Sequence, residues 1–178
     1  MNPINQIPPP ALNEESLADV IRQDSGDRIT LLQHREIEAR IVGPIFRAFA
    51  AEVGAQRARE ILSAVIRELA RSAGYAAAQA LGGNKIEHLG QAIENWCEGG
   101  ALTLEILRRD CEVLEFNVNR CQFAEMYRRL GLEELGPILS CGRDGAMIEG
   151  FNPQIDFQRS QTLMEGASHC DFRNRKHE

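Results

Sequence analysis

One amphipathic stripe constrains the fold of this chain more than any other feature of its sequence. Apolar residues recur every three or four positions, as on one face of an α-helix: Ala58, Ile61, Leu62, Val65, Ile66, Leu69 and Ala73. An alanine-rich continuation reaches Leu81 and suits close packing against another helix, and Gly82 and Gly83 then end the pattern. The stripe therefore predicts a long helix that ends near residue 81.

Two further helices are expected, one before and one after this long helix in the sequence. Before it, apolar residues at positions 37–49 have helical spacing, and Gly43 and Pro44 predict a kink there. After it, residues 86–96 carry a second apolar face, which the glycine pair at 99 and 100 brings to an end. The first half of the chain is therefore predicted to be helical.

The second half of the sequence mixes short strands with short helices. Residues 114–118 alternate apolar and polar side chains, as in a half-buried strand, and Asn119 is expected to cap a helix over residues 120–130. The other expected elements are a helix at 132–141, a turn at 150–153, a strand at 155–163 and a strand from about residue 169. This order predicts an α+β fold with N-terminal helices packed on a small antiparallel sheet with inserted helices.

Composition bounds the domain organisation and the partners. With 43% hydrophobic and 26% charged residues, the 178-residue chain is expected to form one domain over residues 28–178, after a flexible proline-containing tail at residues 1–27. Twenty Lys and Arg against 26 Asp and Glu leave a net charge of −6, which argues against nucleic acid as a partner. Nothing in the sequence approaches the ~18–20 apolar residues of a membrane span. We therefore expect no membrane partner.

The cysteines and the N-terminus bear on the compartment. The chain has five cysteines, an odd number, and its first residues lack the apolar segment of a secretory signal. We therefore expect a cytoplasmic protein with reduced thiols. The alanine-rich helix end and exposed strand edges are compatible with a homo-oligomer, although no feature fixes its order.

Residues able to do chemistry gather in the second half: Cys121, Cys141, Asp144, Arg159, His169, Cys170 and Asp171. Cys121 is expected in the first turn of a helix, where the helix dipole and the neighbouring Arg120 would lower the pKa of a thiol. This makes Cys121 the first candidate nucleophile and Cys170 the second. In the first half, Glu36 and Glu38 are expected to be solvated, with a carboxylate that faces the sheet from the helix start as the open alternative.

A metal site is the alternative for the same cysteines. Cys121, Cys141 and Cys170, together with Asp144, form a plausible ligand set for a divalent metal such as zinc or manganese. The signal is modest because the chain has no CxxC or HExxH spacing. The sequence therefore assigns no cofactor.

Arg159 is expected on the face of its strand that points at the helices. A charge on a covered face needs a carboxylate partner or an anionic ligand. Gln161 shares that face and adds a second polar group. Binding of an anion and an internal ion pair are both open at this point.

In the expected strand from about residue 169, successive side chains point to opposite faces of the sheet. Cys170 and Phe172 would point to one face, and His169, Asp171 and Arg173 to the other. His169 is therefore a poor base for Cys170 unless the backbone bulges there.

Several segments resemble the L-2-amino-thiazoline-4-carboxylic acid hydrolase family. They are residues 116–121 (FNVNRC), 124–127 (AEMY), 130–132 (LGL), 140–144 (SCGRD), 149–153 (EGFNP) and, most specific, 159–173 (RSQTLMEGASHCDFR). The resemblance covers about residues 30–175. One departure is Asn174, which stands where an aromatic residue is expected and should alter packing at a sheet edge.

The resemblance implies a hydrolase that opens a cyclic amidine carrying a carboxylate, giving a carbamoyl-cysteine. Either a thiolate or a metal-bound hydroxide would attack the ring carbon. The implied catalytic residues are Cys121, Cys170, Asp144, His169 and Asp171, and the implied substrate-binding residues are Arg159, Gln161 and Arg173. The closing pattern also resembles vinyl-reductase-like domains, which implies as the alternative a non-catalytic sensor of a small molecule or metal.

Overall fold

Three helices come first, as the sequence predicts. The computed structural model describes residues 29–177, so the expected tail at 1–27 lies outside the described residues. The helices are α2 (Leu31–Val53), α3 (Ala55–Leu81) and α4 (Ile86–Glu94), with a 3-10 turn at Asn95–Gly100. Gly82 ends α3 in the left-handed conformation at φ 67°, which favours glycine, and Pro44 lies inside α2.

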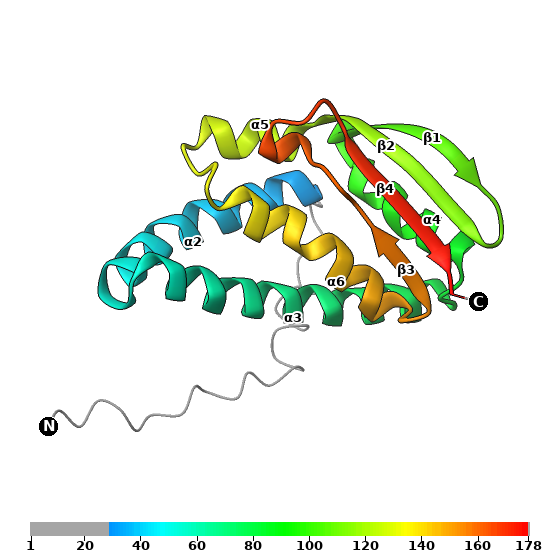
Figure 1. Ribbon diagram of the computed structural model, residues 1–178, viewed down its shortest axis with the longest axis horizontal. Coiled ribbons are helices and arrows are strands. Elements are labelled where there is room, and N and C mark those ends of the chain that lie inside the picture. The colour runs from blue at the N-terminus through cyan, green and yellow to red at the C-terminus, as the bar shows by residue number, and fades with distance from the viewer. Residues whose placement is uncertain (1–28, 178) are drawn as a thin grey trace, which may run out of the picture.

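Four antiparallel strands form one sheet in the order β1-β2-β4-β3 (Figure 1). The strands are β1 (Leu102–Arg109), β2 (Val113–Cys121), β3 (Ile155–Gln158) and β4 (Cys170–Lys176). Between β2 and β3 the chain inserts α5 (Gln122–Arg129), a π-helical turn (Pro137–Cys141) and α6 (Gly142–Phe151). The α+β fold with inserted helices is therefore confirmed.

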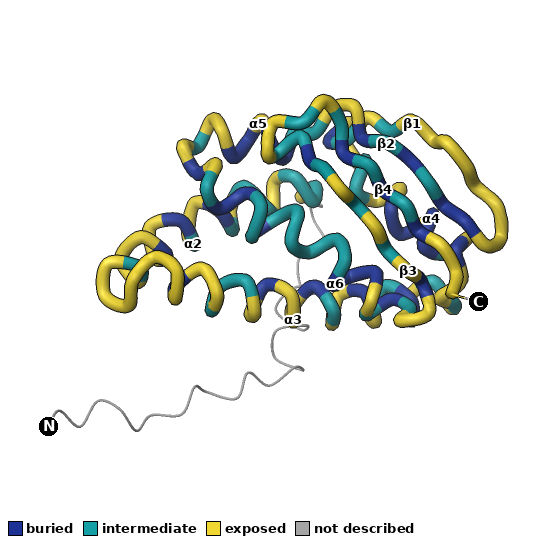
Figure 2. Tube along the Cα trace, viewed as in Figure 1, coloured by how far each residue is buried: buried dark blue, intermediate teal, exposed yellow. Residues whose placement is uncertain are grey.

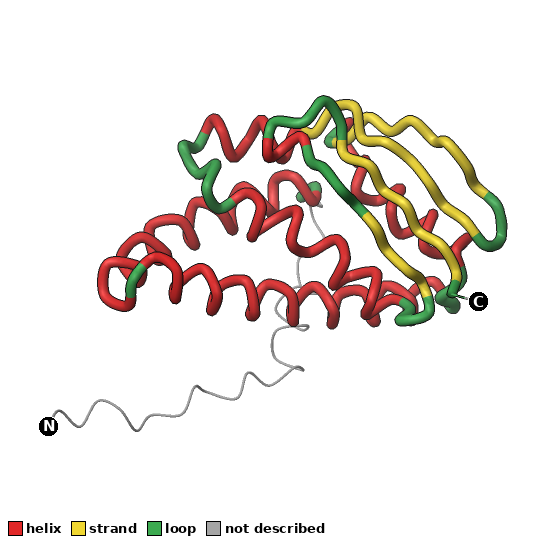
Figure 3. The backbone as a smooth tube through the Cα atoms, viewed as in Figure 1, coloured by secondary structure: helices red, strands yellow, loops and turns green. Residues whose placement is uncertain are grey.

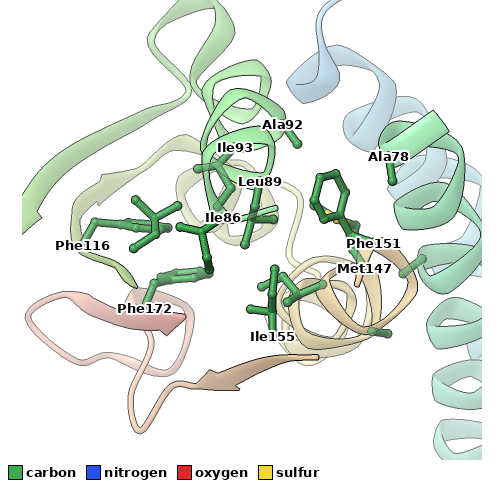
Figure 4. Close-up of a cluster of buried hydrophobic side chains, with 14 of the residues drawn as sticks. Ala78, Ile86, Leu89, Ala92, Ile93, Phe116, Met147, Phe151, Ile155 and Phe172 are labelled. Carbon is green, nitrogen blue, oxygen red and sulfur yellow. The ribbon is translucent and has the colours of Figure 1, made fainter. Parts of the chain in front are cut away.

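The main core lies between the sheet and the helices α3, α4 and α6. Phe116 of β2 and Phe172 of β4 are buried partners across the sheet, with stacked rings whose centroids are 4.7 Å apart. Leu89 of α4 and Phe151 of α6 are also buried in this cluster (Figure 4). This core fixes the strands that carry the cysteines against the helices that carry the charged residues.

A second core lies under α2, between that helix and the segment from α5 to the π-helical turn. Ala39 and Phe46 of α2 pack there with Tyr127 and Leu139. The opposite side of α2 and the outer strand β1 are largely exposed (Figure 2). The described residues include no helix long and apolar enough to cross a membrane.

Helices α3 and α6 cross at very short range. A Cβ atom added at Gly74 of α3 would lie 2.0 Å from the carbonyl oxygen of Met147, and one added at Gly150 of α6 would lie 2.0 Å from the carbonyl oxygen of Arg71. Real Cβ atoms do not approach other atoms so closely. Glycine is therefore required on both sides of this crossing.

Several expectations about local structure are wrong, including the following three (Figure 3). Strand β2 continues to Cys121, whose own side chain caps α5, so Asn119 is not the cap. Strand β3 ends at Gln158, and Leu163 begins a 3-10 turn instead of extending the strand. Asn174 lies in the interior strand β4 and is fully buried, so it does not belong to a sheet edge.

Candidate functional site

A small cavity of about 110 Å³ lies between the helices and the sheet. Its apolar wall comes mainly from Trp96, Leu102, Val118, Phe123, Met147 and Phe172. Pockets for drug-sized ligands usually measure roughly 300–1,000 Å³, so this volume suits a molecule with a single small ring. The polar wall consists of three thiols, three arginines, one carboxylate and Ser140.

Three cysteines from three different elements line this cavity: Cys121 at the end of β2, Cys141 in the π-helical turn and Cys170 at the start of β4. The backbone N–H of Ala124 donates to the Cys121 sulfur at 3.4 Å, and that of Leu163 donates to the Cys170 sulfur at 3.2 Å. All five cysteines of the chain are among the described residues and are free thiols.

The expectation of an activated thiolate at Cys121 is wrong. Burial raises the pKa of the Cys121 thiol to about 11, although the N–H groups of Ala124 and Phe123 oppose the shift. Burial likewise raises the pKa of Cys141 and of Cys170. Arg120 pairs with Glu125 on the outside of the molecule, so it does not supply an unpaired positive charge to the thiol. The cavity thiols are therefore neutral at neutral pH.

We expect the three cavity cysteines to react slowly with iodoacetamide at neutral pH. Their alkylation should be at least about tenfold slower than that of the exposed Cys111, because only the thiolate attacks. Peptide mapping by mass spectrometry against time measures each rate. Equal rates for Cys121 and Cys111 would mean that Cys121 is activated after all.

The donors do not form a metal site. Among residues 29–177, no group of three Cys, His, Asp or Glu side chains is arranged to hold a metal ion. The site proposed from Cys121, Cys141 and Cys170 is therefore not supported, since thiols that share a cavity wall need not converge on one point.

Asp144 and Arg159 form an ion pair on the cavity wall. The Arg159 guanidinium donates to the Asp144 carboxylate and, at 3.0 Å, to the carbonyl oxygen of Cys141. Burial raises the pKa of Asp144 to about 6, although Arg159 opposes this shift. Arg159 also lies over the ring of Phe172, with 5.2 Å between the guanidinium carbon and the ring centroid. Of the two readings for Arg159, the internal pair is the one observed.

A second charged group lies beside this pair and was missed from the sequence. Both oxygens of Glu38 accept hydrogen bonds from guanidinium groups: Arg35 donates to one at 2.8 Å and Arg143 to the other. Glu38 was expected to be solvated, but its side chain is only 20% exposed. Arg35 and Arg143 both line the cavity. The one sequence signal for this group was Arg143, which directly precedes Asp144 in the chain.

The remaining predicted site residues do not line the cavity. Asp171 accepts hydrogen bonds from Ser160 and from the backbone of Gln161, and these bonds lower its pKa although burial opposes them. Arg173 donates to the carbonyl oxygen of Phe116 and to Asn117, and the Gln161 amide lies 3.0 Å from the His169 ring. The structure therefore brings together Cys121, Cys141, Cys170, Asp144 and Arg159, and leaves these four residues outside.

The fold and cavity define an α+β domain with a small cavity lined by thiols and charged side chains. A comparison with family models places the chain more narrowly, because the model described as L-2-amino-thiazoline-4-carboxylic acid hydrolase matches residues 34–174. The chain belongs to this family.

A solved structure shares the fold. It is the phenol-responsive sensory domain of the transcription activator PoxR with phenol, at a TM-score of 0.53 and 14% sequence identity, covering 91% of this chain and 87% of that one. No curated protein sequence matches the chain. At this identity the likeness concerns the fold alone.

Proposed function

We propose that this protein is a hydrolase that opens a small heterocycle carrying a carboxylate, such as L-2-amino-thiazoline-4-carboxylate. The family name supports hydrolysis, and the cavity volume supports a single-ring substrate. The observation that carries the proposal is Asp144, a carboxyl on the cavity wall whose pKa is raised to about 6. A carboxyl with such a pKa can both accept and return a proton near neutral pH.

In the proposed reaction, a nucleophile adds to the ring carbon between nitrogen and sulfur. The Asp144 carboxylate takes the proton of the attacking group and later gives it to the ring heteroatom as its bond to that carbon breaks. When water attacks, the product is a carbamoyl-cysteine that contains the substrate plus one water. When Cys121 or Cys170 attacks first, water then releases the same product from the covalent adduct. Because these thiols are neutral, the thiol route also needs Asp144 as base.

The alternative is a sensor domain that binds a small molecule without reacting. Neutral thiols and the mostly apolar wall favour this reading, and the structural neighbour is a sensory domain crystallised with phenol. A sensor would bind its ligand tightly and keep that binding when the cysteines become serine.

Turnover of L-2-amino-thiazoline-4-carboxylate by the full chain, followed by mass spectrometry, tests the proposal. We expect a product heavier by one water, and we expect Cys121→Ser or Cys170→Ser to slow its formation by at least about 100-fold if a thiol attacks. Cys111→Ser, an exposed cysteine outside this cavity, is the matched control. Substrate binding without product would contradict the hydrolase and favour the sensor. The cytoplasmic location and the homo-oligomer stay predictions.

A further inference from the structure

We propose that Arg35 and Arg143 bind the carboxylate of the ligand and so determine its specificity. The proposal deepens the proposed function and rests on it for the substrate class. Arg35 comes from the second turn of α2 and Arg143 from the start of α6, and both residues line the same cavity. They are held side by side because each donates to a different oxygen of Glu38.

Some N–H groups of these two arginines donate to no acceptor among the described residues. Arg35 donates through Nη1, and Arg143 through Nε to the carbonyl oxygen of Leu139 at 2.7 Å and through Nη2 to Glu38. Within the part of the chain that the structure describes, Nε and Nη2 of Arg35 and Nη1 of Arg143 have no hydrogen-bond acceptor. An incoming carboxylate, which has two oxygens, can be bound by donors from both groups.

Charge on the cavity wall favours an anion. Arg35, Arg143 and Arg159 line the cavity, whereas Asp144 is the only carboxylate among the lining residues and Glu38 is not one of them. The side chains of Arg35 and Arg143 are only 18% and 12% exposed. Positive charge that is largely removed from water and shares a single carboxylate is costly, and a bound anion would compensate for it.

Arg159, the arginine predicted from the sequence to bind substrate, is less suited to this task. Its guanidinium already donates to Asp144 and to the carbonyl oxygen of Cys141, and it lies over the ring of Phe172. Its role in the site is to hold Asp144 in place. If the carboxylate of the substrate lies at Arg35 and Arg143, the ring can rest on the apolar wall with Asp144 beside it.

Calorimetric titration of the full chain with two unreactive probes tests the proposal. Thiazole-4-carboxylate carries the ring and the anion but no amidine carbon, and thiazole-4-carboxamide is its neutral counterpart of the same shape. We expect wild-type protein to bind the carboxylate at least about tenfold more tightly than the amide, as expected for hydrogen bonds between charged groups. Arg35→Gln and Arg143→Gln should each weaken carboxylate binding by about 10- to 100-fold and leave amide binding nearly unchanged.

Arg40→Gln is the matched control, because Arg40 also lies on α2 and also pairs with a glutamate, Glu36, but stands outside the cavity. It should leave binding of both probes unchanged. Arg35→Lys keeps the charge and should recover part of the lost affinity, which guards against variants that fail to fold. Equal affinity of the wild-type protein for the two probes, or an equal loss for both probes in the glutamine variants, would overturn the proposal.

The probes cannot be hydrolysed at an amidine carbon, so this experiment measures binding alone. A negative result here is therefore independent of a negative result in the turnover assay. Carboxylate selectivity that depends on Arg35 and Arg143, without turnover of the thiazoline, would support the anion site and count against the hydrolase. Turnover with a KM that Arg35→Gln and Arg143→Gln leave unchanged would support the hydrolase and overturn the anion site.

Discussion

Replacing Gly74 with alanine should unfold the protein at a markedly lower temperature. The new Cβ would lie 2.0 Å from the carbonyl oxygen of Met147 and 2.8 Å from the backbone nitrogen of Phe151, both in α6. Backbone atoms inside a helix cannot rotate away as a side chain can, so α3 and α6 would have to separate. We expect a loss of at least about 3 kcal/mol, which lowers Tm by at least about 6 °C for a domain of this size. Thermal unfolding followed by circular dichroism measures it.

Gly90→Ala provides the comparison within the same protein. Gly90 also lies in a helix, α4, but the nearest atom to its added Cβ is Nη2 of Arg109, at 3.0 Å, the far end of a flexible side chain. That side chain can move, and alanine favours a helix by about 1 kcal/mol over glycine. Tm should therefore stay unchanged or rise. A similar loss in both variants would contradict the importance of the α3–α6 crossing.

Asp144→Asn should lower kcat/KM for the thiazoline by at least about 100-fold, because an amide can neither take nor return the proton. In the wild-type protein, the pKa of about 6 places the change in rate near that pH. Asp144 acts first as a base, so kcat/KM should rise as the pH increases through about 6, when the carboxyl loses its proton. Initial rates across a pH series, for both proteins, measure this profile.

Asp156→Asn is the matched control for the charge change. Asp156 lies on β3, is exposed and accepts a hydrogen bond from Gln158, outside the cavity. Its replacement should leave both the rate and the pH profile unaltered. If Asp144→Asn kept the full rate, or if the wild-type profile were flat near pH 6, the assignment of Asp144 as the proton-transfer group would be wrong.

The elements that could be predicted from the sequence are those with an uninterrupted period. The apolar stripe of α3 and the alternation in β2 are both of this kind. Strand β1 was missed because it is an outer strand whose side chains are mostly exposed, with two irregularities in its pairing to β2. Helix α6 was missed because Gly145 and Gly150 resemble turn residues. Gly150 in fact lies inside α6, where the absence of a side chain allows α3 to approach closely.

The sequence predicted part of the cavity lining but not its electrostatics. Cys121, Cys170 and Asp144 do meet at one cavity, as their density in the sequence indicates. The pKa of a thiol depends on burial, which position at a helix start does not reveal, so the direction for Cys121 was wrong. Arg35 could not be connected to the site because its shared partner, Glu38, lies 105 positions from Arg143.

The distance along the chain between the walls of the cavity has a consequence for synthesis on the ribosome. Arg35 is made before all three helices are complete, whereas Cys170 and Phe172 are made only after β1, β2 and β3, and β4 lies between β2 and β3 in the sheet. Until β4 has left the ribosome, β2 and β3 have no common neighbour to pair with. Contacts between such remote segments form slowly. A nascent chain that stops before β4 would therefore leave Phe116 of β2 without the Phe172 ring that stacks on it, so the synthesis of β4 both completes the core and completes the cavity wall.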